Sequence, residues 1–119
     1  MPPLRRLLPF LFWAAAVFAL AMALLPHPPR LPGAPGDKVQ HIIAFATLAA
    51  LAALAYPRTR PVRIAILLSL FGAAIEILQL IPPLHRDASL ADWAADSAAL
   101  GLVLLLFAMV RRHRAARRF

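Results

Sequence analysis

Four long apolar segments take up most of the chain, and they constrain its fold more than any other feature. They cover approximately residues 7–25, 39–56, 64–81 and 90–110. At about 1.5 Å per residue, a helix of this length is comparable with the hydrocarbon layer of a bilayer, which is about 30 Å thick. The chain has 119 residues, 62% of them hydrophobic, and a mean hydropathy of +0.75, which is too apolar for an ordinary soluble protein of this size. We therefore predict an all-α integral membrane protein, a single domain built as a bundle of four transmembrane helices.

Prolines mark the ends of the apolar segments. Residues 26–36 are dense in proline and glycine and cannot continue a helix, so a new helix is predicted to start at Asp37. Residues 57–63 form a short basic turn between two prolines, and the prolines at 82–83 stop the third helix. A cleaved signal peptide is an alternative for the first segment, because residues 19–21 resemble a processing site, although the apolar run continues past them.

The basic residues lie on one side of this predicted topology. Two precede the first apolar segment, three lie in the turn at residues 57–63 and five in the tail at residues 111–119, which makes ten of the 13 basic residues and none of the five acidic ones. By the positive-inside rule, we predict a multi-pass protein of the bacterial cytoplasmic (inner) membrane, with both termini and the basic tail in the cytoplasm. The net charge of +8 is then explained by topology and by attraction to anionic membrane lipids, so no nucleic-acid partner is expected.

Most of the acidic residues lie in one short stretch, residues 72–96, which holds four of the five. Glu76 and Gln79 are three apart on one helix face, and Ser89, Asp92 and Asp96 follow a three-then-four spacing that also lines one face. Because a charged side chain that faces lipid is costly, these groups should turn into the bundle and pair.

The second apolar segment adds polar residues at the same predicted depth. Asp37 and His41 are four apart near its start, and Lys38 is adjacent. Helix capping is an alternative role for Asp37, Ser89 and Asp92, whereas Glu76 is not at a cap position. We therefore predict a polar, ligand-binding pocket in the outer leaflet, with no metal and no cofactor, lined by Asp37, Lys38, His41, Glu76, Gln79, Arg86, Ser89, Asp92 and Asp96.

Small residues indicate how the predicted helices pack. The alanine-rich second segment should lie inside the bundle, because small side chains let neighbouring helices approach closely. Gly72 and Ser69 in the third segment, with Ser97 and Gly101 in the fourth, are interpreted in the same way. Trp93 is interpreted as an aromatic residue of the membrane interface.

Three short motifs resemble the signatures of the VanZ-like family of small bacterial membrane proteins. They are Asp37-Lys-Val-Gln-His41 with Phe45, Gly72-Ala-Ala-Ile-Glu-Ile-Leu-Gln79, and Arg86-Asp-Ala-Ser-Leu-Ala-Asp92, and the resemblance covers residues 37–101. It implies a multi-pass protein of the cell envelope, in a family named after a member associated with glycopeptide antibiotic resistance, but it implies no particular biochemical activity. Many relatives carry asparagine at the position of Asp96 and glycine at that of Ala99, so a shared charge state of the pocket is in doubt.

The predicted pocket favours binding of a polar envelope ligand, such as the head group of a lipid-linked cell-wall precursor. Lys38, Arg86 and His41 would meet its phosphate. Glu76, Gln79 and Asp92 would orient these cations and accept hydrogen bonds from a sugar or peptide.

One alternative is a membrane enzyme, a hydrolase or transferase that acts on a lipid head group. His41 or Glu76 would be its general base, and a carboxylate pair would act as the acid or as metal ligands. Another is a proton-coupled transporter or flippase that uses Glu76 as a relay. The predicted partners are membrane lipids, with a phosphate-bearing lipid or cell-wall precursor as the ligand. The sequence leaves open whether the chain also forms a homo-oligomer.

Overall fold

A computed structural model of the chain describes residues 3–24, 37–81 and 90–117. These ranges form four α-helices and contain no β-strand. The prediction of an all-helical protein with four helices is therefore confirmed. The helices are α1 (Pro3–Leu24), α2 (Asp37–Ala55), α3 (Pro61–Leu78) and α4 (Leu90–Arg117).

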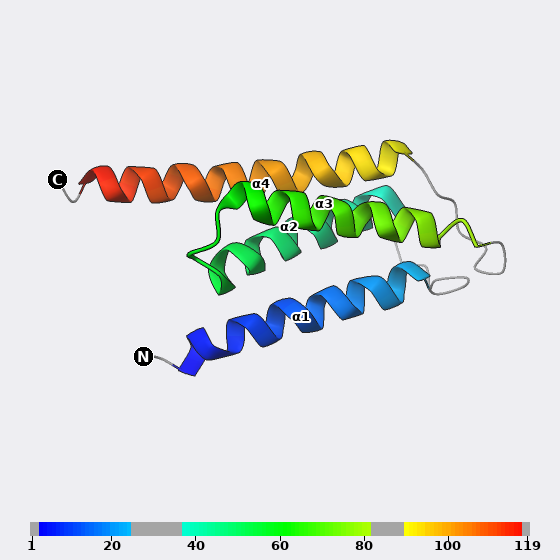
Figure 1. Cartoon of the computed structure of the whole chain (residues 1–119), viewed down its shortest axis with the longest axis horizontal. Helices are drawn as coiled ribbons and strands as arrows, with labels where there is room; N and C mark the ends of the chain where they lie inside the picture. The colour runs from blue at the N-terminus through cyan, green and yellow to red at the C-terminus, as the bar shows by residue number, and fades with distance from the viewer. Residues whose placement is uncertain (1–2, 25–36, 82–89, 118–119) are drawn as a thin grey trace.

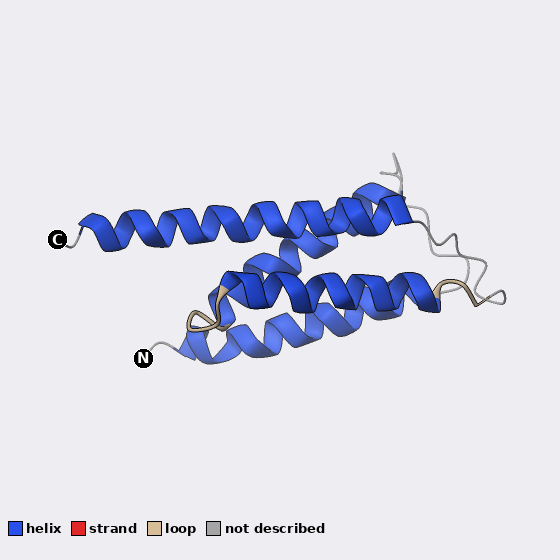
Figure 2. Cartoon of the chain, turned by 45° about the horizontal axis from the view of Figure 1, so that its top comes forward, coloured by secondary structure: helices blue, strands red, loops and turns tan. Residues whose placement is uncertain are grey.

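The helices lie lengthwise beside one another (Figure 1), and they define two ends of the bundle. One end, which we call the basic end, contains the start of α1 at Pro3, the turn at residues 56–60 and the end of α4 at Arg117. The opposite end, which we call the polar end, contains the start of α2 at Asp37 and the start of α4 at Leu90. Figure 2 shows the same arrangement from another side.

The helix starts at Asp37 and Leu90 agree with the predictions, whereas four other boundaries differ by three residues or more, among them the start of α3 at Pro61. α1 begins before the apolar segment and includes two arginines, and α4 continues through the basic tail to Arg117. Arginine is a good helix former, so a run of arginines does not by itself end a helix. α3 ends at Leu78, where the sequence predicted residue 81, and a turn follows.

α2 is the innermost helix of the bundle. It packs against each of the other three helices, and Leu48, Ala49, Ala52 and Ala53 on it are almost completely buried. Because alanine side chains are short, the neighbouring backbones can approach α2 closely. The predicted position of this alanine-rich segment inside the bundle is confirmed.

The outer surface of the bundle is apolar. Large hydrophobic side chains of α1, α3 and α4 are exposed along the described parts of these helices. By length and composition, α1, α3 and α4 are each able to cross a membrane, whereas the apolar part of α2, Val39–Ala55, is shorter. An apolar surface of this extent is unfavourable in water and is compatible with a protein surrounded by lipid.

At the basic end, α4 is attached to α2 through Arg111. Its Nη2 donates a hydrogen bond to the carbonyl oxygen of Ala53 (2.6 Å), and its Nη1 donates one to that of Pro57 (3.3 Å). The last carbonyls of a helix have no partner within the helix, and a cationic donor satisfies them well. Arg111 therefore caps the end of α2 from the neighbouring helix.

Candidate functional site

Three ionisable side chains from three helices meet near the polar end. His41 lies on α2, Glu76 on α3 and Asp96 on α4, and all three are buried, with exposed fractions of 9%, 9% and 2%. By helical rise, they lie about 3–9 Å inside the nearest helix end. We call these three residues the polar cluster.

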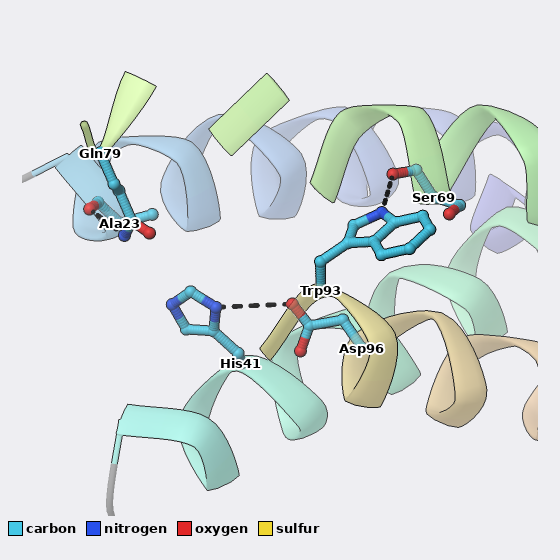
Figure 3. A network of polar contacts seen from close by, with 6 residues as sticks. All are labelled: Ala23, His41, Ser69, Gln79, Trp93 and Asp96. Atoms are coloured by element: carbon cyan, nitrogen blue, oxygen red, sulfur yellow. Dashed lines mark hydrogen bonds and ion pairs between the residues drawn. The ribbon is translucent and has the colours of Figure 1, made fainter. Parts of the chain in front are cut away.

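The cluster is compact. His41 Nδ1 lies 3.5 Å from Asp96 Oδ2 (Figure 3), and one potential ligand atom from each of the three residues lies within 4.8 Å of the other two. The sequence predicted that these residues reach a common depth inside the bundle. Their convergence on one point, from three separate helices, agrees with that prediction.

The Asp96 carboxylate is the least satisfied member of the cluster. Among the described residues, neither of its oxygens accepts a hydrogen bond, although the side chain is only 2% exposed. A buried polar group without a hydrogen bond costs about 1–3 kcal/mol, and a charged one costs more. The contact with His41 offsets this cost when the imidazole is protonated, and a bound cation or hydrogen-bond donor would offset it further.

Gln79 lies in the same region but is tied to α1. Its Nε2 donates a hydrogen bond to the backbone carbonyl oxygen of Ala23 at 2.8 Å, as Figure 3 shows. Its Oε1 accepts no hydrogen bond from the part of the chain that the structure describes, and the side chain is only 1% exposed. Gln79 therefore attaches α1 to α3 and leaves a second buried acceptor at the polar end.

A layer of contacts beside the cluster holds α3 and α4 together. Trp93 Nε1 donates a hydrogen bond to the Ser69 carbonyl oxygen at 3.0 Å, and the hydroxyls of Ser69 and Ser97 lie 2.9 Å apart. Trp93 is half-buried, and its side chain extends from α4 toward α3 in Figure 3. From the sequence we interpreted Trp93 as an aromatic residue of the membrane interface, but its indole N–H donates a hydrogen bond to α3 inside the bundle.

The two helical glycines differ in their surroundings. A methyl group at Gly72 would lie 3.3 Å from Phe45 Cζ and 3.6 Å from Trp93 Cδ1. At Gly101, a methyl group would meet no atom within 4 Å. The prediction of close helix packing is therefore confirmed for Gly72 and wrong for Gly101. Gly72 lies one turn from Glu76 and Phe45 one turn from His41, so this contact sets the relative height of two cluster residues.

The other predicted pocket residues are placed less fully. Asp92 is half-buried in the first turn of α4, one turn from Asp96. Asp37 and Lys38 lie in the first turn of α2, but their side chains are outside the described part of the structure. Arg86 and Ser89 also lie outside the described residues.

The sequence did not indicate that the cluster has the spacing of a metal site. The pairs that lie one turn apart on one helix, Asp37 with His41 and Asp92 with Asp96, do not form the cluster, because each of the three helices supplies one of its ligands. The signal that could have indicated it is the common predicted depth of His41, Glu76 and Asp96, combined with three helices that face one another.

Comparisons of the chain with models of protein families, with curated proteins and with solved structures found no match.

Proposed function

We propose that the chain is a VanZ-like, multi-pass protein of the bacterial cytoplasmic membrane that binds the polar head group of an envelope amphiphile in its outer leaflet. In this proposal, four helices cross the membrane, and the basic end faces the cytoplasm. The head group of a lipid-linked cell-wall precursor is the favoured ligand. The VanZ-like assignment rests on the three sequence motifs and stays a prediction.

The observation that carries this proposal is the set of unsatisfied acceptors at the polar end. Asp96 Oδ1 and Oδ2 and Gln79 Oε1 are buried and accept no hydrogen bond from the described residues. Sugar hydroxyls and amino groups are donors that would satisfy these oxygens. A ligand rich in such donors therefore gains hydrogen bonds that the protein alone does not make.

The position of these acceptors favours an amphiphilic ligand. They lie within about two helical turns of the polar end, beside an outer surface that is apolar along the bundle. A lipid whose tail lies along that surface would bring its head group to the same depth. Lys38 and Arg86, which belong to the predicted pocket, are the candidates to meet a phosphate on that head group.

The distribution of charge favours binding over transport. Between the polar cluster and the basic end, the described helices carry no Asp, Glu, Lys, Arg or His in α2 after His41, in α3 between Arg63 and Glu76, or in α4 between Asp96 and Arg111. A proton relay across a membrane normally uses a chain of ionisable groups. Each of these helices therefore lacks the relay groups that the transport alternative requires.

Native mass spectrometry of the delipidated protein tests the binding proposal. The added ligand is a polyprenyl diphosphate that carries N-acetylglucosamine, because this head group offers hydroxyl and amide donors to the buried acceptors. We expect a 1:1 adduct with the wild type and with Ser97→Ala, which removes a neighbouring hydroxyl of α4 that contacts Ser69. The adduct should be lost with Asp96→Leu, which removes the buried acceptors, and weakened with Arg86→Ala. A wild type that binds neither this lipid nor a copurifying one, or an adduct that survives both changes, would refute the proposal.

The absence of cysteine from the chain makes its orientation directly testable. Single cysteines at Thr59 and Ala88 should react differently with a membrane-impermeant thiol reagent added to intact cells or spheroplasts. We expect labelling at position 88 and protection at position 59 until the membrane is permeabilised. Labelling of position 59 from outside would show the opposite orientation.

A further inference from the structure

The ligand atoms of the polar cluster lie close to the separations that a single metal ion requires. Zn²⁺ binds histidine nitrogen and carboxylate oxygen at about 2.0–2.2 Å in tetrahedral geometry, so two of its ligands lie about 3.3–3.6 Å apart. The His41 Nδ1 to Asp96 Oδ2 distance is 3.5 Å, and all three ligand atoms lie within 4.8 Å of one another. The His41–Asp96 pair already has the tetrahedral separation, and a closure of about 1 Å by side-chain rotation would bring in the third ligand atom.

A second observation points to a ligand at the same place. Asp96 is only 2% exposed, and neither carboxylate oxygen accepts a hydrogen bond from the described residues. A carboxylate in this situation normally pairs with a cation or coordinates a metal. Because Asp96 lies within contact distance of His41, the unsatisfied oxygens belong to the cluster itself.

We propose that His41, Glu76 and Asp96 together bind one divalent transition-metal ion, of the Zn²⁺ or Mn²⁺ class. Imidazole suits zinc and related ions, and carboxylates suit both zinc and manganese, whereas Ca²⁺ and Mg²⁺ prefer oxygen ligands alone. Three protein ligands leave at least one coordination position open. Because the three ligands come from α2, α3 and α4, the bound ion would also hold these three helices together.

The proposed metal site adds to the proposed function. Only one part of it rests on that function, namely that the open coordination position of the ion binds the lipid head group. A cluster with two carboxylates repels a phosphate directly, but a divalent ion between them would attract it. The ion would therefore supply the positive charge next to the buried acceptors. Binding of the ion alone does not require the lipid.

The test is a titration of tag-free, chelator-treated protein in detergent with Mn²⁺, monitored by the electron paramagnetic resonance signal of the free ion, and with Zn²⁺ as competitor. Removal of any histidine tag is essential, because a tag would bind both ions. We expect one Mn²⁺ per chain, displaced by Zn²⁺. Asp96→Asn, Glu76→Gln and His41→Gln should each weaken binding at least tenfold.

Asp87→Asn is the matched control, because it removes the same charge from a residue that does not belong to the predicted pocket or to the polar cluster. It should change the affinity less than twofold. If Asp87→Asn and Asp96→Asn weaken binding equally, the effect comes from overall charge and the inference is overturned, as it would be by a wild type that binds no ion. Helical content by circular dichroism confirms folding of each variant, and a rise in the wild-type melting temperature on addition of Zn²⁺ provides a test that needs no variant.

Repeating the lipid-binding measurement with Mn²⁺ or with chelator separates the two proposals. Metal binding without a lipid adduct would refute the proposed function and leave the metal site standing. A lipid adduct that is unchanged by chelator, in a protein that binds no ion, would refute the metal site and leave the function standing. An adduct that requires the ion would support both.

Discussion

Replacing either Gly72 or Gly101 by alanine adds one methyl group to the neighbouring helices α3 and α4, and the two variants should change stability in opposite directions. Alanine favours a helix over glycine by about 0.5–1 kcal/mol at an unstrained position. At Gly101 the added methyl meets no atom within 4 Å, so we expect this gain with no opposing term.

At Gly72 the same gain is opposed by a close contact. The added methyl would lie 3.3 Å and 3.4 Å from two ring carbons of Phe45, which is 2% exposed. This ring also packs on Phe71, with centroids 6.0 Å apart, so it cannot shift without disturbing a second ring. Overpacking of a buried site typically costs about 1–3 kcal/mol. Because the helix gain is common to both variants, Gly72→Ala should be about 1–3 kcal/mol less stable than Gly101→Ala.

The assay is equilibrium unfolding of both variants and the wild type in mixed micelles with increasing denaturing detergent, followed by circular dichroism. The expected order of midpoints is Gly101→Ala, wild type, Gly72→Ala. If Gly72→Ala unfolds at the same midpoint as Gly101→Ala, the helices do not approach at this position as closely as described, and the account of how the polar cluster is kept in register fails.

Three further changes test contacts of the fold in the same assay. Arg111→Gln removes the charged donor to two carbonyls at the end of α2 and should destabilise by about 1.5–3 kcal/mol, whereas Arg112→Gln at an exposed neighbour should change stability by less than about 0.5 kcal/mol. Trp93→Phe keeps an aromatic ring but loses the hydrogen bond to α3, for an expected loss of about 1 kcal/mol, and an unchanged midpoint would contradict that bond. Gln79→Met should cost a similar amount, about 1 kcal/mol, and increase protease access to α1, and an equally stable variant would show that this contact contributes nothing.

Much of the fold follows from apolar length and from prolines. Pro61 lies in the first turn of α3, where its missing N–H and fixed φ are tolerated, and the sequence located this boundary to within a few residues. Leu90 begins α4 as expected. The basic residues were less informative about helix ends, because arginine indicates the charged side of a topology and not the point at which the backbone leaves the helix.

The candidate site was predicted in part, and the limits have a physical cause. His41, Glu76 and Asp96 could be assigned to one depth, because rise per residue is fixed along a helix. The rotation of each helix about its axis is set by packing against its neighbours, and no local pattern contains it. For that reason the sequence did not predict that Gln79 reaches the backbone of α1 or that Gly101 faces open space.

The continuity of α4 has a mechanical consequence. As one helix of 28 residues it is about 42 Å long, and Asp96 lies about 22 Å along it from Arg111. Since Arg111 is fixed to the end of α2, it can serve as the pivot of any change in tilt. A tilt of about 5° around that pivot would move Asp96 by about 2 Å, which is the difference between a ligand that reaches its neighbours and one that does not. The contacts of Trp93 and Ser97 with Ser69 oppose such a tilt near the cluster, so its geometry is held by contacts at both ends of α4.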